Sequence, residues 1–510
     1  MAPHFSRRRF LESAATGGAL LGLTDLGFLS GLPPVSAADA QPDHGRVRLR
    51  PEIEPLVRLI EDSPRNQLLE EVAHHIRRGT SYKDVLAALM LAGVCNVEPR
   101  PSVGFKFHAV LVVNSAHLAS LASPDADRWL PLFWALDNFK SAQAQNAKER
   151  AGWRMKPVAE DKVPTARKAR EAFTAAMDQW DEPAADAAVA GLARSAGAQE
   201  VFELFVRYGA RDFRDIGHKA IFVANSWRTL QTIGWQHAEP VLRSLAYALL
   251  RHEGDNPATR DGDPDRPGRK NRELVANIRP DWLDGKPSRE ATVDLLAALR
   301  HAKADEAPAK VVEVINGGAS PQAVWDALLL GAGELLLRQP GIVALHAVTS
   351  TNALHYAYEA TANDETRKWL MLQNASFITL FRDALAGRGK VGDARIDALE
   401  PLEPSKSSED AVAEMFADVS KDRLTAARKV LGYTAAKGDP RAVMDAARLL
   451  VFFKGNDSHD YKFSSAHLED YDHVSPEWRD RFLAAGMMNF KGSGNKDVPL
   501  VQRARAALKS

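Results

Sequence analysis

The stretch His-Ala-Val-Leu-Val-Val-Asn-Ser-Ala-His at residues 108–117 returns at residues 346–355 as His-Ala-Val-Thr-Ser-Thr-Asn-Ala-Leu-His. Both copies keep histidine at the first and tenth positions and asparagine at the seventh. The flanking segments also match, because a glycine-serine turn precedes each copy and a Trp-Leu pair follows it. The duplicated unit is at least about 50 residues long, and a duplication of that size shapes the whole fold.

A third and weaker copy lies between these two. Residues 220–226 align with residues 109–115 and retain the asparagine as Asn225. Arg228 stands where the other copies have their second histidine, and the preceding histidine, His218, is displaced by one residue. If the three copies share an origin, the middle one has diverged in its polar positions.

Helical periodicity dominates the chain, whereas the alternation typical of strands is almost absent. Apolar residues recur at three- and four-residue spacing, as in Val85, Ala88 and Leu89. The turns at residues 79–81 and 317–321 carry signals that end one helix and cap the next. The sequence therefore predicts an all-α fold of internally repeated helical hairpins, packed as a bundle or a short array.

The predicted organisation has three parts. They are a signal peptide at residues 1–40, a repeated helical domain at 41–398 with units at about 55–160, 190–255 and 300–390, and a C-terminal helical unit at 399–510. Prolines interrupt two polar segments, residues 255–271 and 399–410, which we expect to form a long surface loop and a linker.

The N-terminus has the pattern of a twin-arginine export signal. Residues 6–12 contain Arg7 and Arg8 before Phe10, an apolar stretch follows, and a small-x-small site ends at residue 40. Retention of the apolar stretch as an anchor is the alternative, which its glycines and Asp25 disfavour. We expect a periplasmic or secreted protein that uses the twin-arginine export machinery and has no stable membrane span after cleavage.

Charge and cysteine content exclude several functional classes. The 66 acidic residues balance the 66 basic residues, so no nucleic-acid-binding patch is implied. Cys95 is the only cysteine, which excludes an intramolecular disulfide and a cysteine-rich metal site. Any metal must therefore be held by His, Asp, Glu or Asn. The sequence also lacks a glycine-rich phosphate loop and a serine-hydrolase elbow.

The repeated polar residues are the first candidates for chemistry. Positions three apart on a helix differ by about 60° in azimuth, so Asn114 and His117 share a face, as do Asn352 and His355. His355 also precedes Glu359 by one turn, and imidazole with carboxylate suits iron, manganese or zinc. We therefore predict His117, His355 and Glu359 as metal ligands, with the two asparagines as orienting partners.

His108 and His346 lie nine residues earlier, about 180° around a straight helix. They cannot join the same site from the same helix, so we expect them to meet a neighbouring repeat as further ligands or acid/base groups. The alternative is that buried His-Asn pairs only satisfy polar groups between packed helices. Their presence in two apolar helices favours function, since burial without partners would cost about 2 kcal/mol or more.

The middle copy offers further candidates. Arg228 could bind an anionic substrate or neutralise a carboxylate of the fold. His218 and His237 are expected to be ordinary helix-end or core histidines, with a ligand role as the alternative.

The densest cluster of ionisable groups lies at residues 459–473. His459 and Lys462 could belong to a metal site, an acid/base pair or a substrate contact. Against this stands the helix-start signal at residues 475–477, which favours a partly looped, solvated segment at 454–474.

The histidine-containing helices resemble the questin oxidase-like family. The resemblance rests on residues 104–110 with 129–135, and on residues 345–349 with 353–354, which are 21 of the 510 residues. It implies a mostly helical, histidine-rich protein that opens anthraquinone rings oxidatively with a reduced nicotinamide cofactor. The export signal and the 459–473 cluster lie outside this pattern, which leaves the substrate class open. Because reduced nicotinamide is scarce outside the cytoplasm, we do not expect that cofactor here.

Together these patterns predict an exported all-α oxidoreductase. Histidines of the repeated helices are expected to bind a single metal, iron or another divalent ion, that activates a small organic substrate or oxygen. The alternative is a helical-repeat binding or scaffold protein without catalysis. The predicted catalytic residues are His108, His346, Arg228, His459 and Lys462.

Overall fold

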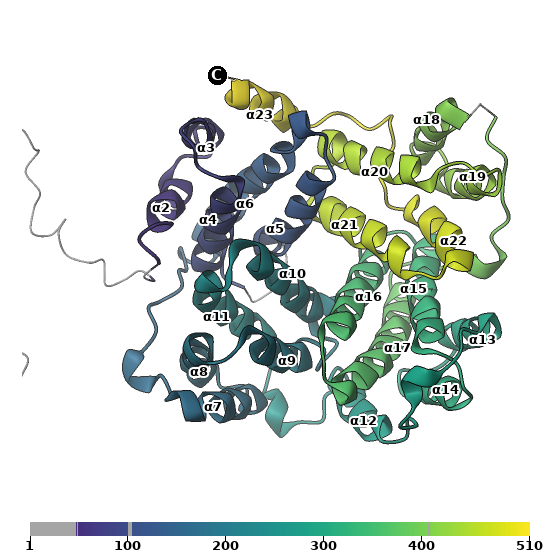
Figure 1. Ribbon diagram of the computed structural model, residues 1–510, viewed down its shortest axis with the longest axis horizontal. Helices are drawn as coiled ribbons and strands as arrows, with labels where there is room; N and C mark the ends of the chain where they lie inside the picture. The colour runs from purple at the N-terminus through teal and green to yellow at the C-terminus, as the bar shows by residue number, and fades with distance from the viewer. Residues whose placement is uncertain (1–46, 48, 100–104, 406–407, 510) are drawn as a thin grey trace, which may run out of the picture. The chain divides into compact units, whose positions relative to one another are not determined.

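The two copies of the repeated stretch form α5 (Phe105–Leu121) and α16 (Ile342–Ala360) in the computed structural model, which describes residues 47, 49–99, 105–405 and 408–509 (Figure 1). The first copy is flanked by α4 (Tyr82–Asn96) and α6 (Leu130–Glu149), and the second by α15 (Pro321–Arg338) and α17 (Asp364–Ala386). Within these residues no strand forms, and one isolated bridge joins Lys286 to Ala319. The prediction of an all-α fold is confirmed. The predicted signal peptide lies outside the described residues.

The predicted helix starts are present. Ser81 at the start of α4 and Ser320 at the start of α15 each accept a hydrogen bond from the backbone N–H three residues later. Gly79 and Gly318 precede them at φ +102° and +99°, a conformation that residues with a Cβ rarely adopt. Each such cap contributes about 1 kcal/mol. The duplicated sequence thus encodes duplicated helix boundaries.

The remaining helices lie before, between and after the two copies. Before the first copy are α2 (Glu54–Asp62) and α3 (Leu68–Arg77). Between the copies are α7 (Ala166–Gln179), α8 (Glu182–Ser195), α9 (Ala198–Gly209), α10 (His218–Ile233), α11 (Ala238–Leu249), α12 (Arg266–Val275), α13 (Arg289–Leu299) and α14 (Glu306–Asn316). After the second copy are α18 (Ser408–Val419), α19 (Arg423–Ala435), α20 (Pro440–Lys454), α21 (Ser458–His473), α22 (Pro476–Gly486) and α23 (Pro499–Lys509).

Two segments expected to be loops are partly or wholly helical. The predicted loop at 255–271 ends early, because α12 begins at Arg266 with a proline in its first turn, where the missing N–H costs nothing. The predicted partly looped segment at 454–474 contains the continuous helix α21. A capping box between Asp457 and Asp460 fixes its start, so acidic side chains that suggested a solvated loop instead nucleate the helix.

Four helices, α5, α10, α16 and α21, form the centre of the fold. Both α10 and α21 pack on α5 and on α16, which closes a four-membered ring (Figure 1). The helices run parallel, since their first turns meet at one end and the rings of His355 and His473 lie 4.7 Å apart towards the other.

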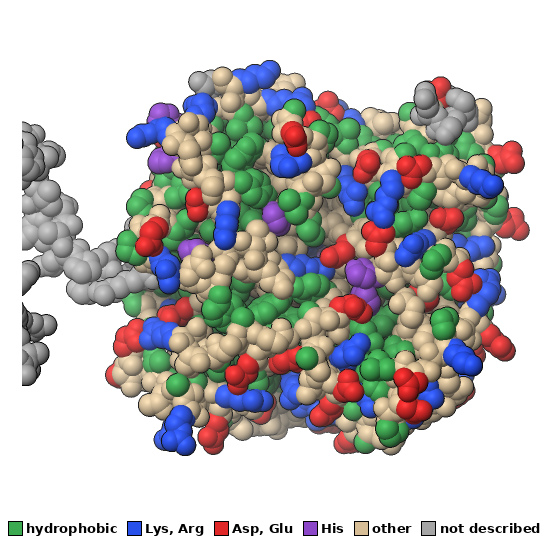
Figure 2. All heavy atoms as spheres, in the orientation of Figure 1, with side chains coloured by type: hydrophobic (Ala, Val, Ile, Leu, Met, Phe, Trp, Pro, Cys, Tyr) green, Lys and Arg blue, Asp and Glu red, His purple; other side chains and the backbone are tan. Residues whose placement is uncertain are grey.

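Each central helix also packs against the two helices that flank it in the chain, which are α4 and α6, α9 and α11, α15 and α17, and α20 and α22. The outer helices shield the ring from solvent, so α16 is buried on nearly all sides. The face shown in Figure 2 carries acidic and basic side chains interspersed, in keeping with the balanced charge. Polar residues inside the ring therefore need a specific explanation.

Candidate metal centre

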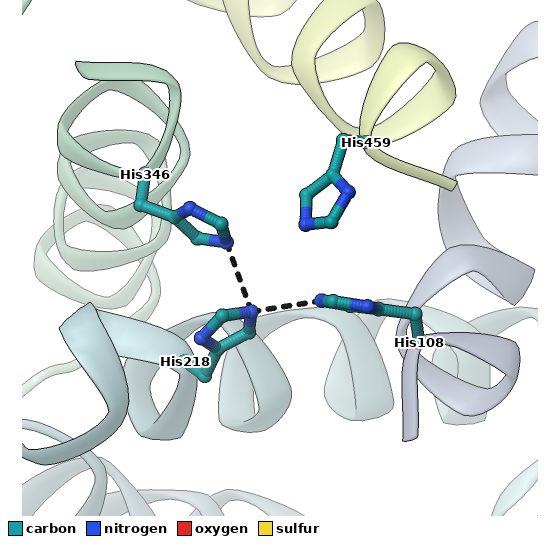
Figure 3. Close-up of side chains that lie close together, drawn as sticks. All are labelled: His108, His218, His346 and His459. Atoms are coloured by element: carbon teal, nitrogen blue, oxygen red, sulfur yellow. Dashed lines mark hydrogen bonds between the residues drawn. The ribbon is translucent and has the colours of Figure 1, made fainter. Parts of the chain in front are cut away.

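Each central helix carries one histidine in its first turn or close to it. The four are His108 on α5, His218 on α10, His346 on α16 and His459 on α21. Because the helices run parallel around one ring, these turns meet and the imidazoles converge (Figure 3). We name this group the four-histidine cluster. Among the residues that the structure describes, it is the one group of three or more His, Cys, Asp or Glu side chains that could hold a metal ion.

The cluster is closely spaced and buried. The Nε2 atom of His218 lies 2.9 Å from Nε2 of His108 and 2.9 Å from Nε2 of His346. One ring nitrogen of each of the four histidines lies within 4.8 Å of the others. His108, His218 and His346 are at most 3% exposed, whereas the side chain of His459 is 19% exposed. His459 therefore forms the most accessible side of the cluster.

Hydrogen bonds on the far side of the rings fix the tautomers. Nδ1 of His218 lies 2.5 Å from the carbonyl oxygen of Asp215, and Nδ1 of His346 lies 2.6 Å from that of Ile342. A carbonyl oxygen can only accept, so both Nδ1 atoms carry the proton and donate it. Nδ1 of His459 lies 2.6 Å from the Asp457 carboxylate. Such partners are typical of histidines that bind metals through Nε2.

A strained turn places His218. Asp215 and Ile216 have φ of +57° and +46°, a left-handed conformation that costs non-glycine residues about 1–3 kcal/mol each. Gly217 follows at +79°, and a Cβ there would collide with the side chain of Ser350. The turn directs the carbonyl of Asp215 to the His218 ring. Backbone strain of this kind persists only where the surrounding structure holds it in place, here in the turn that positions the His218 ring.

Burial keeps the deepest imidazoles neutral. It lowers the pKa of His108, His218 and His346 well below the usual value, and the positive charge of Lys462 lowers these pKa values further. Neutral imidazole is the form that binds metal ions, so no proton has to be displaced from these rings at neutral pH.

In the neutral state that burial favours, His218 and His346 have no proton to share across their 2.9 Å contact. Each neutral ring keeps its one N–H on Nδ1, so two Nε2 lone pairs face one another and repel unless a cation lies between them. Two nitrogen ligands at right angles on one ion, each about 2.1 Å from it, are about 3 Å apart. The spacing therefore fits neighbouring ligands of a single metal ion; a proton shared by the two rings is the alternative.

The structure places the three predicted metal ligands outside the four-histidine cluster. Nδ1 of His117 lies 3.2 Å from the hydroxyl of Tyr82. His355 packs edge-on against Trp325 and lies 3.8 Å from the exposed carboxylate of Glu359. Nine residues of helix separate each histidine from the cluster residue of its own copy, a rise of about 13 Å. As expected for the other pair, His108 and His346 do meet a neighbouring repeat, through His218.

A second polar layer lies about two helical turns after the four-histidine cluster, along the axes of the central helices. Asn114, Asn225 and Asn352 line a small cavity there, together with Arg228 and Lys462. The cavity volume is about 10 Å³, room for about one water molecule. Two of the predicted catalytic residues, Arg228 and Lys462, thus border one cavity.

Glu469 closes this cavity. Arg228 Nη2 donates to its Oε2 at 2.6 Å, and Asn352 Nδ2 donates to the same atom at 2.8 Å. Asn352 also donates to Asp470 at 2.9 Å, and burial raises the pKa of that carboxyl well above its usual value. The amide of Asn352, predicted to orient a histidine, is therefore directed to the acidic residues of α21.

Two members of the cluster were harder to find in the sequence. His218 is one residue out of register with the other copies, because the left-handed turn precedes it. α21 had not been recognised as a further central helix, although residues 464–467, Ser-Ser-Ala-His, are similar to Asn-Ser-Ala-His at 114–117. That similarity is the signal that would have placed His459 beside the repeated histidines.

Comparison of the chain with protein-family models, curated proteins and solved structures gives no match. Among the described residues, no helix has the length and apolar character needed to cross a bilayer.

Proposed function

We propose that this protein is an exported oxidoreductase whose four-histidine cluster binds one redox-active metal ion, with iron as the first candidate, and that it acts on a small organic substrate. The observation that carries the proposal is the 2.9 Å separation between the Nε2 atoms of His218 and His346, whose Nδ1 atoms both contact backbone carbonyl oxygens. An all-imidazole donor set suits iron, copper, nickel or zinc, whereas magnesium and calcium prefer oxygen ligands.

The surroundings favour chemistry over a purely structural ion. Structural metal sites are usually isolated from other polar groups that could act on a substrate, but here Lys462, one helical turn after His459, lines a polar cavity together with Arg228. A redox-active ion would supply electron exchange with a bound substrate. The proposed twin-arginine signal adds support, because that export route is typical of proteins that fold around a cofactor before they leave the cytoplasm.

Metal analysis of the full-length protein tests the proposal. Protein purified from cells supplied with iron, manganese, copper and zinc should contain about one equivalent of metal, measured by mass spectrometry of the elements. His218→Gln and His346→Gln should each lose most of it, because each removes one of two facing ligands. His117→Gln and His355→Gln are matched controls from the same repeated stretches, and both should retain the metal.

Two results would contradict the proposal. A wild type that stays metal-free after reconstitution would favour the scaffold alternative, in which the polar layers only satisfy the core. Loss of metal from the two control variants to the same extent as from the cluster variants would move the site away from the four-histidine cluster. The oxidoreductase assignment is tested by the absorption and electron paramagnetic resonance signals of the bound metal. If no tested substrate or oxidant changes these signals, the assignment is contradicted.

A further inference from the structure

Lys462 is a buried ammonium group without a partner. It lies one turn after His459 on α21, is 2% exposed, and its Nζ has no hydrogen-bond partner among the described residues. It lines the small cavity, and its charge lowers the pKa of His108, His218 and His346. Burial of an unpaired charge is costly, and it lowers the pKa of Lys462 itself to about 7.

The neighbouring acidic groups do not supply the missing counter-charge. Glu469 is already paired with Arg228, and burial raises the pKa of Asp470, which favours the uncharged form of that carboxyl. Asp457 is the acid that raises the pKa of Lys462, but its carboxylate also accepts from His459. A divalent ion would add two positive charges, and four helix N-termini add partial positive charge. When Lys462 is protonated, one carboxylate does not balance this total, and an anion bound beside it would stabilise the ammonium form.

An open cleft adjoins the small cavity. Its volume is about 280 Å³, and Leu118, Ser465 and Glu469 line both spaces. Several other residues of the cleft are apolar or aromatic: Ala119, Ala122, Val451, Tyr461 and Leu468. The side chain of Glu469 is 28% exposed, so its rotation would join the cleft to the cavity. The cleft is near the lower size limit of pockets that bind small ligands.

We propose that the carboxylate of a small organic acid takes the place that the Glu469 side chain leaves when it rotates, beside the cavity that Lys462 lines, and that the apolar part of the acid occupies the adjoining cleft. The carboxylate would pair with the Lys462 ammonium and accept hydrogen bonds from the amide layer. This inference rests on the proposed function in that the acid would be the substrate of the metal centre. The subsite itself is formed by protein side chains, so it can be tested without metal.

Benzoate and benzamide test the proposal, because they have nearly the same shape and differ in charge. Their dissociation constants are measured by calorimetry on the full-length protein, both metal-free and metal-loaded. Benzoate should bind wild type at least about tenfold more tightly than benzamide, as expected for a charge-assisted contact. Lys462→Met should remove that preference. Arg448→Met, which removes a cation from the cleft wall outside the cavity, should keep it.

The outcomes separate this inference from the proposed function. Equal affinities of wild type for benzoate and benzamide would overturn it without any variant, so a poorly folded Lys462→Met cannot obscure the result. A preference for benzoate that survives Lys462→Met, or that is lost in Arg448→Met instead, would also overturn it. If the protein binds no metal but Lys462 still sets the preference for benzoate, the proposed metal chemistry fails and the subsite stands.

Discussion

Acidification should destabilise the metal-free protein through the four-histidine cluster. Burial holds the folded-state pKa of His108, His218 and His346 well below the value of about 6.5 expected in the unfolded chain. Below that pH the unfolded state binds protons that the folded state does not, so stability falls as the pH falls. Well above it all three imidazoles are neutral in both states, and the cluster adds no pH dependence.

The size of the effect follows from the number of protons. Each depressed histidine contributes about 1.4 kcal/mol per pH unit once the pH is about one unit below 6.5, so three contribute about 4 kcal/mol per unit. A proton shared between His218 and His346 in the folded state would leave two to be taken up, or about 3 kcal/mol per unit. His355 and His467, whose pKa values are lowered to about 3 and about 4, add the same background in every variant.

Urea unfolding of chelator-treated, full-length protein between about pH 7.5 and about pH 5 measures this slope. The double variant His218→Gln/His346→Gln should lose about 3 kcal/mol per pH unit of it. His74→Gln changes an exposed histidine at the end of α3 and serves as the control. If the free energy of unfolding depends on pH equally steeply in the double variant and in wild type, the depressed pKa values of His218 and His346 are refuted.

Three further changes probe the support of the centre and of the fold. Asp457→Asn should weaken metal binding about 10- to 100-fold in a chelator competition, because it removes the carboxylate that orients the His459 ring. Gly217→Ala should lower metal occupancy with little change in helix content by circular dichroism, since the new side chain displaces the turn before α10. Arg300→Met should lower the free energy of unfolding by about 3–5 kcal/mol in urea titrations and leave metal content unchanged, because the buried carboxylate of Glu334 loses its arginine and Asp397 keeps only Arg395. Loss of metal in this last variant would show that the two regions are coupled.

Much of the fold could be predicted because it depends on local signals. Helix periodicity, the serine caps at Ser81 and Ser320, and the duplication itself are all visible in one sequence. α21 stands where a loop is predicted, because acidic residues typical of a solvated segment here form its capping box. The helix-start signal at residues 475–477 does precede α22, but it carries no information about the segment before it.

The convergence of the four histidines could not be derived in the same way. It depends on which helices become neighbours and on their common direction, and both follow from packing between segments far apart in the chain. Spacing along one helix drew attention to the His355–Glu359 pair, which shares a face as expected but has an exposed carboxylate. Helix geometry places His108 and His346 on the opposite face from His117 and His355, which predicts partners from another repeat. In the structure that partner is His218.

The ring of parallel helices also has a consequence for biogenesis. Its four nitrogen donors come from α5, α10, α16 and α21, so a polypeptide that stops short of α21 cannot assemble the complete set. Contacts between such distant segments form late, after long loops have closed. If the cluster binds its metal only after α21 has packed, metal binding would distinguish the complete fold from a truncated or half-folded chain, because such a chain lacks one or more of the four ligands.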